Sequence, residues 1–124
     1  MGAVPRPKNQ ESLMRKPKFE ILAGKDGKIY FHLKAANGEI ILAGRGFKTK
    51  SETIHAIASV MRYGQLESCI IRRESANGQF FFQIKSPSGR ILGWSEMYIS
   101  RQNRDLGILA VKRAVSYGRV FDLN

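Results

Sequence analysis

Cysteine, acidic residues and long apolar runs are all scarce in this sequence of 124 residues. The single cysteine, Cys69, excludes an intramolecular disulfide and is typical of a protein kept in a reducing compartment. No apolar run approaches the roughly 18 to 20 residues that a membrane-spanning helix needs. The first 18 residues lack the apolar stretch of a secretory signal. These absences predict a cytoplasmic protein that does not enter a membrane.

Motifs for catalysis or metal binding are missing as well. The two histidines, His32 and His55, belong to no cluster of histidine, cysteine or carboxylate residues at metal-ligand spacing. The sequence has no P-loop and no G-x-S-x-G nucleophile motif, and its acidic residues are scattered. We therefore expect a protein that is not an enzyme and needs no cofactor or metal ion.

Positive charge is what the sequence has in excess. It holds 21 Lys and Arg residues against 10 Asp and Glu residues, which gives a formal net charge of +11. Net charge informs on partners and solubility rather than on fold. A polyanion, either a nucleic acid or an acidic protein surface, is the natural partner of such a chain. The alternative is a basic domain whose charge serves no particular partner.

An internal repeat organises most of the chain. With a shift of 51 residues, the two copies align without a gap from Gly27 to Arg62. The identical pairs combine turn glycines, core apolar residues and lysines: Gly27 with Gly78, Phe31 with Phe82, Lys34 with Lys85, Gly38 with Gly89, Ile57 with Ile108, and Val60 with Val111. We expect two copies of one unit, at residues 19–65 and 66–124.

Each copy has the pattern of three strands followed by a helix. Asp26-Gly27 and Asn77-Gly78 are typical of tight turns, and the segments after them are rich in β-branched and aromatic residues. The expected strands are residues 19–22, 28–34 and 40–43 in copy one, about 68–73, 79–85 and 91–94 in copy two, and a last short strand within 119–123.

Two helices are expected from capping residues and apolar spacing. Thr49 and Glu52 form a capping box, in which each side chain satisfies a free backbone N–H of the other residue, and the helix that follows is expected to stop at Gly64. Ser100 is the expected cap of the second helix, which is predicted to end at Gly118.

Two arginine clusters point toward an external anion. Arg101 and Arg104 fall in the first turn of the second helix, where positive charge opposes the helix dipole and does not favour the helix. The pair Arg72-Arg73 forms the other cluster. These positions are interpreted as contacts with a bound polyanion.

Three stretches of the sequence carry a resemblance to a known family. They are residues 34–41 (KAANGEII), 95–98 (SEMY) and 107–112 (GILAVK). On these stretches the chain resembles the YegP-like family of small tandem-repeat proteins. The resemblance implies an α+β fold in which tandem β-β-β-α(-β) repeats form one antiparallel sheet, with two helices on one face and the C-terminal strands exchanged between units. The units occur twice per chain or once per subunit, so a monomer and a strand-exchanged homodimer both stay open.

Alternation along the strands divides the central side chains between two faces. The all-apolar set, which we expect the helices to cover, consists of Ile29, Phe31, Leu33, Phe80, Phe82 and Ile84. The opposite face is then expected to display Tyr30, His32, Lys34, Phe81, Gln83 and Lys85. By the same parity, Arg90 and Trp94 should share one face of the third strand of copy two.

A face of interleaved aromatic and cationic residues suits single-stranded nucleic acid. Aromatic rings stack on bases of any sequence, and lysines neutralise phosphates. The leading hypothesis is therefore a non-enzymatic module that binds RNA or single-stranded DNA through these six residues and Arg90. The alternative is that the rings of Tyr30 and Phe81 only pair across strands and stabilise the sheet, or pack under the N-terminal segment.

The N-terminal segment, residues 1–18, is expected to be a flexible basic arm outside the domain of residues 19–124. Its cations are Arg6, Lys8, Arg15, Lys16 and Lys18. The arm either follows the phosphates of a bound nucleic acid or is a solvated tail.

A second functional hypothesis is a protein-interaction module, either an accessory subunit or a phage or mobile-element inhibitor, that docks on an acidic protein surface.

Overall fold

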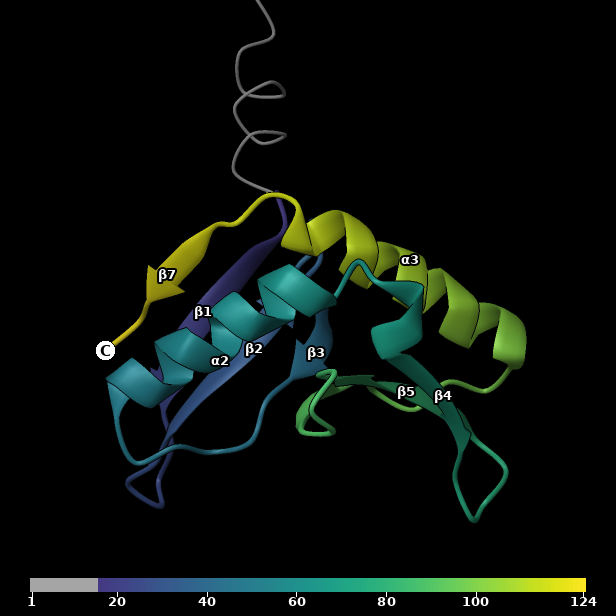
Figure 1. Ribbon diagram of the computed structural model, residues 1–124, viewed down its shortest axis with the longest axis horizontal. Coiled ribbons are helices and arrows are strands. Elements are labelled where there is room, and N and C mark those ends of the chain that lie inside the picture. Colours follow the sequence, from purple (N-terminus) through teal and green to yellow (C-terminus); the bar gives the residue numbers. More distant parts are fainter. Residues whose placement is uncertain (1–15) are drawn as a thin grey trace, which may run out of the picture.

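The strands of the two copies join in one seven-stranded sheet, in the order β4-β5-β6-β3-β2-β1-β7 (Figure 1). The computed structural model describes residues 16–124. Copy one supplies β1 (Lys18–Ala23), β2 (Ile29–Lys34) and β3 (Ile40–Ala43). Copy two supplies β4 (Ile70–Glu74), β5 (Phe80–Lys85), β6 (Ile91–Trp94) and β7 (Val120–Asp122). The copies meet at the centre, where Ala43 of β3 pairs with its counterpart Trp94 of β6.

One strand pair departs from the antiparallel sheet that the sequence predicted. β7 pairs in parallel with β1, whereas every other neighbouring pair within residues 16–124 is antiparallel. Helix α3 (Arg101–Val115) connects β6 near the middle of the sheet to β7 at the edge, where β7 runs in the same direction as β1. The fold class is α+β, as expected, but the sheet is mixed.

The borders of the two copies also differ from the expected ones. β1 begins at Lys18 and Pro17 is already buried, so the folded domain starts before the expected boundary at residue 19. In copy two, a short 3₁₀ turn, η1 (Glu67–Cys69), occupies the expected start of the first strand, and β4 begins only at Ile70. Residues 1–15 lie outside the described part of the chain.

The four hairpin turns are made by glycines at equivalent positions of the two copies. Gly27 and Gly78 have φ values of 80° and 82°, and Gly38 and Gly89 have φ values of 88° and 96°. Only glycine enters this left-handed region without a steric cost, so the glycines fix where each strand reverses. The predicted turns are confirmed in both copies.

Helix α2 (Lys50–Tyr63) begins at the predicted cap but with different bonding. The Thr49 hydroxyl oxygen accepts from the Glu52 backbone N–H at 3.1 Å, as expected. The Glu52 carboxylate, however, accepts from the Thr49 hydroxyl at 3.1 Å instead of from a backbone N–H. The cap is thus half of the expected reciprocal box.

Helix α3 begins at the predicted cap and ends earlier than predicted. The Ser100 hydroxyl accepts from the Asn103 backbone N–H at 3.0 Å. The helix stops at Val115, and Ser116 and Tyr117 form a turn before Gly118, which has a φ of 61°. Gly118 therefore follows the turn rather than the helix itself.

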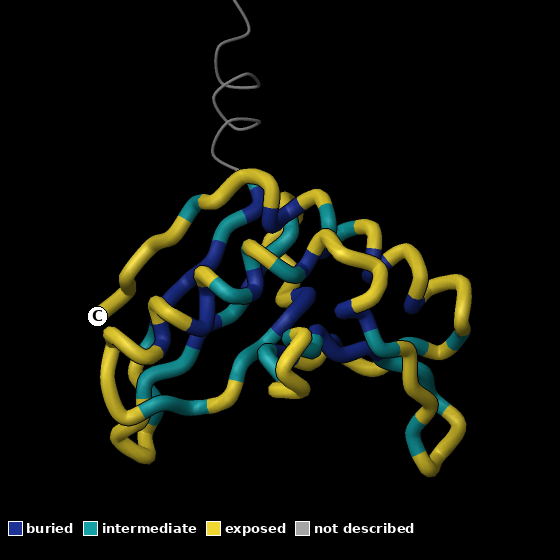
Figure 2. Tube along the Cα trace, viewed as in Figure 1, coloured by how far each residue is buried: buried dark blue, intermediate teal, exposed yellow. Residues whose placement is uncertain are grey.

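Both helices pack on the face that carries Phe31 and Phe82. Phe31, Leu33, Phe82 and Ile84 are completely buried there, which confirms which face the helices cover. Burying one such side chain contributes about 1.5 to 3 kcal/mol before conformational entropy is subtracted. Ile29 and Phe80, at the strand ends, are only half-buried. Figure 2 shows the buried positions along the strands and on the inward sides of the helices, and exposed positions at the turns.

Candidate nucleic-acid interface

The sheet face opposite the helices carries one row of side chains that crosses all seven strands. Each residue of the row is directly paired with the next across the ladder, so all of them point to the same face. From one edge to the other, the row is Ile71, Gln83, Trp94, Ala43, His32, Glu20 and Phe121. With strands about 4.8 Å apart, the row is roughly 29 Å long.

The structure brings the six predicted sheet residues together on this open face. Tyr30, His32, Lys34, Phe81 and Lys85 are half-buried, neither sealed nor fully exposed. Gln83 is more enclosed, with 9% of its surface exposed. The alternation in β2 and β5 therefore placed all six side chains correctly.

Arg90 does not belong to this set, contrary to the expectation that it shares a face with Trp94. The pairing of β5 with β6 shifts register between Ile84 and Lys85. Ile84 pairs with Gly93 and Lys85 pairs with Ile91, so Leu92 of β6 is an unpaired extra residue, a β-bulge. A bulge reverses the parity of the residues beyond it. Arg90 instead lines a hollow on the helix side, together with Glu52 and His55 of α2.

The predicted cations of the N-terminal segment separate in space. Lys18 lies in β1 at the open face, with its ammonium 5.5 Å from the centre of the Phe121 ring. Lys16 lies over the Tyr117 ring, at 5.7 Å, in a groove beside α3. Arg6, Lys8 and Arg15 lie outside the described residues, so their predicted role stays a prediction.

An ion-pair cluster sets the charge on one half of the face. Glu20 accepts from Lys34 at 2.8 Å and lies 3.7 Å from Lys18, so two ammonium groups share one carboxylate. The bond from Lys34 lowers the pKa of Glu20, which stays ionised at neutral pH. Burial, and then the nearby Lys34 charge, lower the pKa of His32, so this imidazole is neutral there. One net positive charge remains on this cluster.

The two predicted rings are held by different neighbours. Tyr30 donates its hydroxyl hydrogen to the Asp26 carboxylate, and its ring lies against Gly24 and Gly46. Phe81 is paired across the ladder with Arg73, whose Nε donates to the Gln83 Oε1 atom at 2.7 Å. Both rings therefore do stabilise local structure, and both still present surface to solvent.

The arginines of the first turn of α3 have partners inside the molecule. The guanidinium of Arg101 lies 4.9 Å from the centre of the Phe80 ring and 3.7 Å from Glu74. Arg104 is buried over the same ring and is 3.3 Å from Asp105. Packing on Phe80 accounts for the buried Arg104, whereas the expected role of Arg101 toward an external anion stays a prediction, because its side chain is largely exposed.

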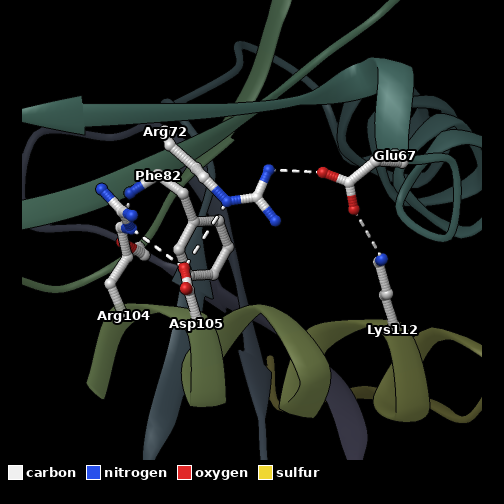
Figure 3. Close-up of polar contacts among 7 residues, drawn as sticks. Glu67, Arg72, Phe82, Arg104, Asp105 and Lys112 are labelled. Carbon is white, nitrogen blue, oxygen red and sulfur yellow. Dashed lines mark hydrogen bonds and ion pairs between the residues drawn. The ribbon is translucent and has the colours of Figure 1, made fainter. Parts of the chain in front are cut away.

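Arg72 belongs to a second internal network, drawn in Figure 3. Glu67 accepts from both Arg72 and Lys112, the latter at 2.9 Å, and Arg72 lies 3.5 Å from Asp105. These two bonds hold the pKa of Glu67 down at about 2. The network ties η1 and β4 to α3 on the helix side, so Arg72 is not part of the open face.

Sequence reasoning missed two aromatic members of the interface. The sequence did not decide which face Trp94 occupies; it stands beside Ala43, the central residue of the row, with 36% of its surface exposed. Phe121 ends the row on β7, and 42% of its surface is exposed. The signal for Trp94 was its place in the repeat, where copy one has Ala43. Phe121 could not be found without the pairing of β7 with β1.

The described part of the chain has neither a cluster of metal ligands nor a helix that could span a membrane. Within residues 16–124, no three His, Cys, Asp or Glu side chains converge as they would around a metal ion. No helix in that part of the chain is long and apolar enough to cross a bilayer. Cys69 is buried in the core, where it packs as a small apolar residue.

The fold and the duplicated unit define a class of protein, the small α+β proteins built from two tandem sheet-and-helix repeats. The family described as "Domain of unknown function (DUF1508)" matches the chain twice, at residues 25–68 and 75–122. The chain belongs to this family, and the predicted YegP-like resemblance is confirmed.

Relatives and solved structures agree with this assignment. The UPF0339 protein PA0329 of Pseudomonas aeruginosa is 38% identical over 97 residues, covering 78% of this chain and 88% of that protein. The UPF0339 protein YegP of Escherichia coli is 36% identical over 94 residues, covering 76% and 86%. The solution structure of E. coli yegP, described as a protein of unknown function, matches with a TM-score of 0.82, 33% identity and coverage of 87% and 93%. That of SO3888 from Shewanella oneidensis matches with a TM-score of 0.82, 30% identity and coverage of 87% and 92%.

Proposed function

We propose that this protein is a non-enzymatic module that binds RNA or single-stranded DNA on the open face of its sheet. The observation that carries the proposal is the row across that face, with Trp94 next to its central residue and Phe121 at one end. Tyr30 and Phe81 add half-buried rings on the same face. An uncovered sheet with aromatic rings is a form of surface on which unpaired bases stack.

The charges supply the other half of binding. Lys18, Lys34 and Lys85 lie on the open face, and the net charge of +11 attracts a polyanion from a distance. Lys18 and Lys34 share Glu20, so the face is less positive than its lysines alone suggest. We therefore expect stacking to determine where the strand lies and the overall charge to determine how fast it arrives.

We further propose that the module works in the cytoplasm as a monomer. β7 fills the edge beside β1 of its own chain, so the exchange of strands between units is completed within one molecule. This leaves no requirement for a second copy to complete the sheet on that side.

A groove beside α3 favours the second candidate, a protein-interaction module. Leu106 and Leu109 are each about 60% exposed and line a groove of about 540 Å³ with Tyr117. Lys16 and Arg113 add positive charge to its lining. Such an apolar groove with basic lining suits an acidic protein segment with apolar anchors.

Binding of fluorescently labelled single strands of roughly 12 nucleotides tests the proposed function. The association constant should fall steeply with salt, with a logarithmic slope of about −0.7 per neutralised phosphate. The double variant Tyr30→Ala/Phe81→Ala should bind at least about tenfold more weakly, since each stacked base contributes about 1 to 3 kcal/mol.

Matched variants separate stacking from folding. Tyr30→Phe keeps the ring but removes its bond to Asp26, and it should bind like the wild-type protein. Leu109→Ala removes an exposed apolar side chain from α3 and should also leave binding unchanged. Binding that is absent at low salt, or that only Leu109→Ala weakens, contradicts the proposal and favours the groove beside α3.

A further inference from the structure

A shallow hollow of about 700 Å³ lies beside Trp94, between the row of the open face and the turn that joins β2 to β3. Trp94 and His32 line it together with two carboxylate residues, Glu39 and Glu96. Among residues 16–124, no Lys or Arg nitrogen lies within 4.0 Å of either carboxylate. The protein has a net charge of +11 and one tryptophan. Two carboxylates line the hollow beside this tryptophan, and neither forms an ion pair with a residue of the described part of the chain.

This composition is specific to one half of the duplicated fold. With the shift of 51 residues, Trp94 corresponds to Ala43, and Glu39 and Glu96 correspond to Arg90 and Arg45. The equivalent positions of the other half therefore have two arginines in place of the two carboxylates. The hollow is a departure from the repeat and not a consequence of building the sheet twice.

The two carboxylates produce a negative potential in and around the hollow. Such a potential repels the phosphates of a nucleic acid. A carboxylate can only accept hydrogen bonds, so the hollow favours a neutral group that donates them.

We propose that this hollow receives one unpaired base that carries an exocyclic amino group, namely adenine, cytosine or guanine, in preference to uracil or thymine. The inference rests on the proposed function and names the base class that this face selects. The base would stack on the Trp94 ring and donate its amino hydrogens to Glu39 and Glu96. Uracil and thymine offer a single N3–H group between two carbonyl oxygens, which the carboxylates repel.

The fluorescence of Trp94 reports on this site directly, because the sequence holds no other tryptophan. The protein is titrated with oligoadenylate, oligocytidylate and oligouridylate of equal length at one salt concentration. The first two should quench Trp94 and bind about tenfold or more tightly than oligouridylate. Equal quenching and equal affinity for all three would overturn the base preference while leaving nucleic-acid binding intact.

A charge-neutral variant tests the role of the carboxylates. Glu39→Gln/Glu96→Gln keeps the shape of the hollow but adds amide donors that can face the carbonyl oxygens of uracil. The preference for adenylate and cytidylate should shrink to about twofold or less, whereas Glu52→Gln, in the hollow beside α2, should keep it. Unchanged preference in the double variant contradicts the inference, and the absence of binding to all three oligomers contradicts the proposed function itself.

Discussion

At the scale of single residues, the two copies fill the same space with different pairs of side chains. In copy two, Tyr98 stacks on Phe82 with the ring centres 6.4 Å apart. A Cβ atom added to Gly107 would lie only 2.2 Å from the Tyr98 hydroxyl oxygen. In copy one, the corresponding residues are Phe47 and Ala56. The larger Tyr98 ring is thus matched by the smaller Gly107, and the smaller Phe47 ring by the larger Ala56. Glycine is needed at position 107 because the Tyr98 hydroxyl occupies the space of a methyl group.

This match predicts the effect of adding one methyl group. Gly107→Ala improves helix propensity by about 1 kcal/mol. Overpacking against the rigid Tyr98 ring costs about 1 to 3 kcal/mol and should prevail, so the variant is expected to be less stable in urea unfolding. In a Tyr98→Phe background, which recreates the pairing of copy one, the loss should become smaller. A loss of equal size in both backgrounds would show that the hydroxyl is not the obstacle.

Residue alternation predicted most of the interface and failed at one place. It placed Tyr30, His32 and Gln83 correctly because β2 and β5 are regular up to their last residue. It misplaced Arg90 because a bulge between Ile84 and Lys85 reversed the parity, and no residue type marks that bulge. The burial of Arg104 over Phe80 could not be predicted, because contact with an aromatic ring and a carboxylate depends on the packing of α3 against β5.

At the scale of elements, the ends of the sheet are stabilised by different means. At one edge, β7 covers β1 with a parallel strand. At the other edge, β4 has no strand beyond it in the described part of the chain, and the ion-pair network of Glu67, Arg72, Asp105 and Lys112 ties it to α3 (Figure 3). Arg72 occupies the position that Ile21 has in copy one, so charge replaces an apolar contact.

The network predicts how stability depends on pH. The folded-state pKa of Glu67 is about 2, below its ordinary value of 4.5. The stability that Glu67 contributes is therefore complete above about pH 5 and is lost as the pH falls toward 2. Glu67→Gln should unfold with a flatter dependence on pH in that interval, measured by urea unfolding at a series of pH values.

A second variant checks that partners, rather than Glu67 alone, cause this dependence. Arg72→Gln removes the first cause of the low pKa while leaving the carboxylate in place. It should flatten the same interval nearly as much as Glu67→Gln does. If both variants keep the wild-type slope, the network makes no contribution to acid unfolding.

The elements themselves were largely visible in the sequence, and their pairing was not. Turn glycines and capping residues identified the hairpins and the starts of both helices because these signals are local. The parallel pairing of β7 depends on where α3 delivers the chain, and η1 depends on contacts with α3. Neither is encoded by a local pattern.

At the scale of the whole molecule, duplication produces one wide sheet with helices on a single side. The helices bury the Phe31 and Phe82 side, and no other element within residues 16–124 covers the opposite face of the seven strands. Departures from the repeat, namely Trp94 for Ala43 and Glu39 for Arg90, make the two halves of the molecule unequal. The proposed function requires a ligand to contact that open face rather than the helices.

Nuclear magnetic resonance of the ¹⁵N-labelled protein with an unlabelled single-stranded oligonucleotide tests this requirement most directly. The largest chemical-shift changes should fall on the indole N–H of Trp94 and on the amides around His32 and Gln83, and the exposed side of α3 around Leu109 should change little. Shifts confined to α2 or α3, or none at low salt with a saturating excess of oligonucleotide, would contradict the assignment of the open sheet face as the binding surface.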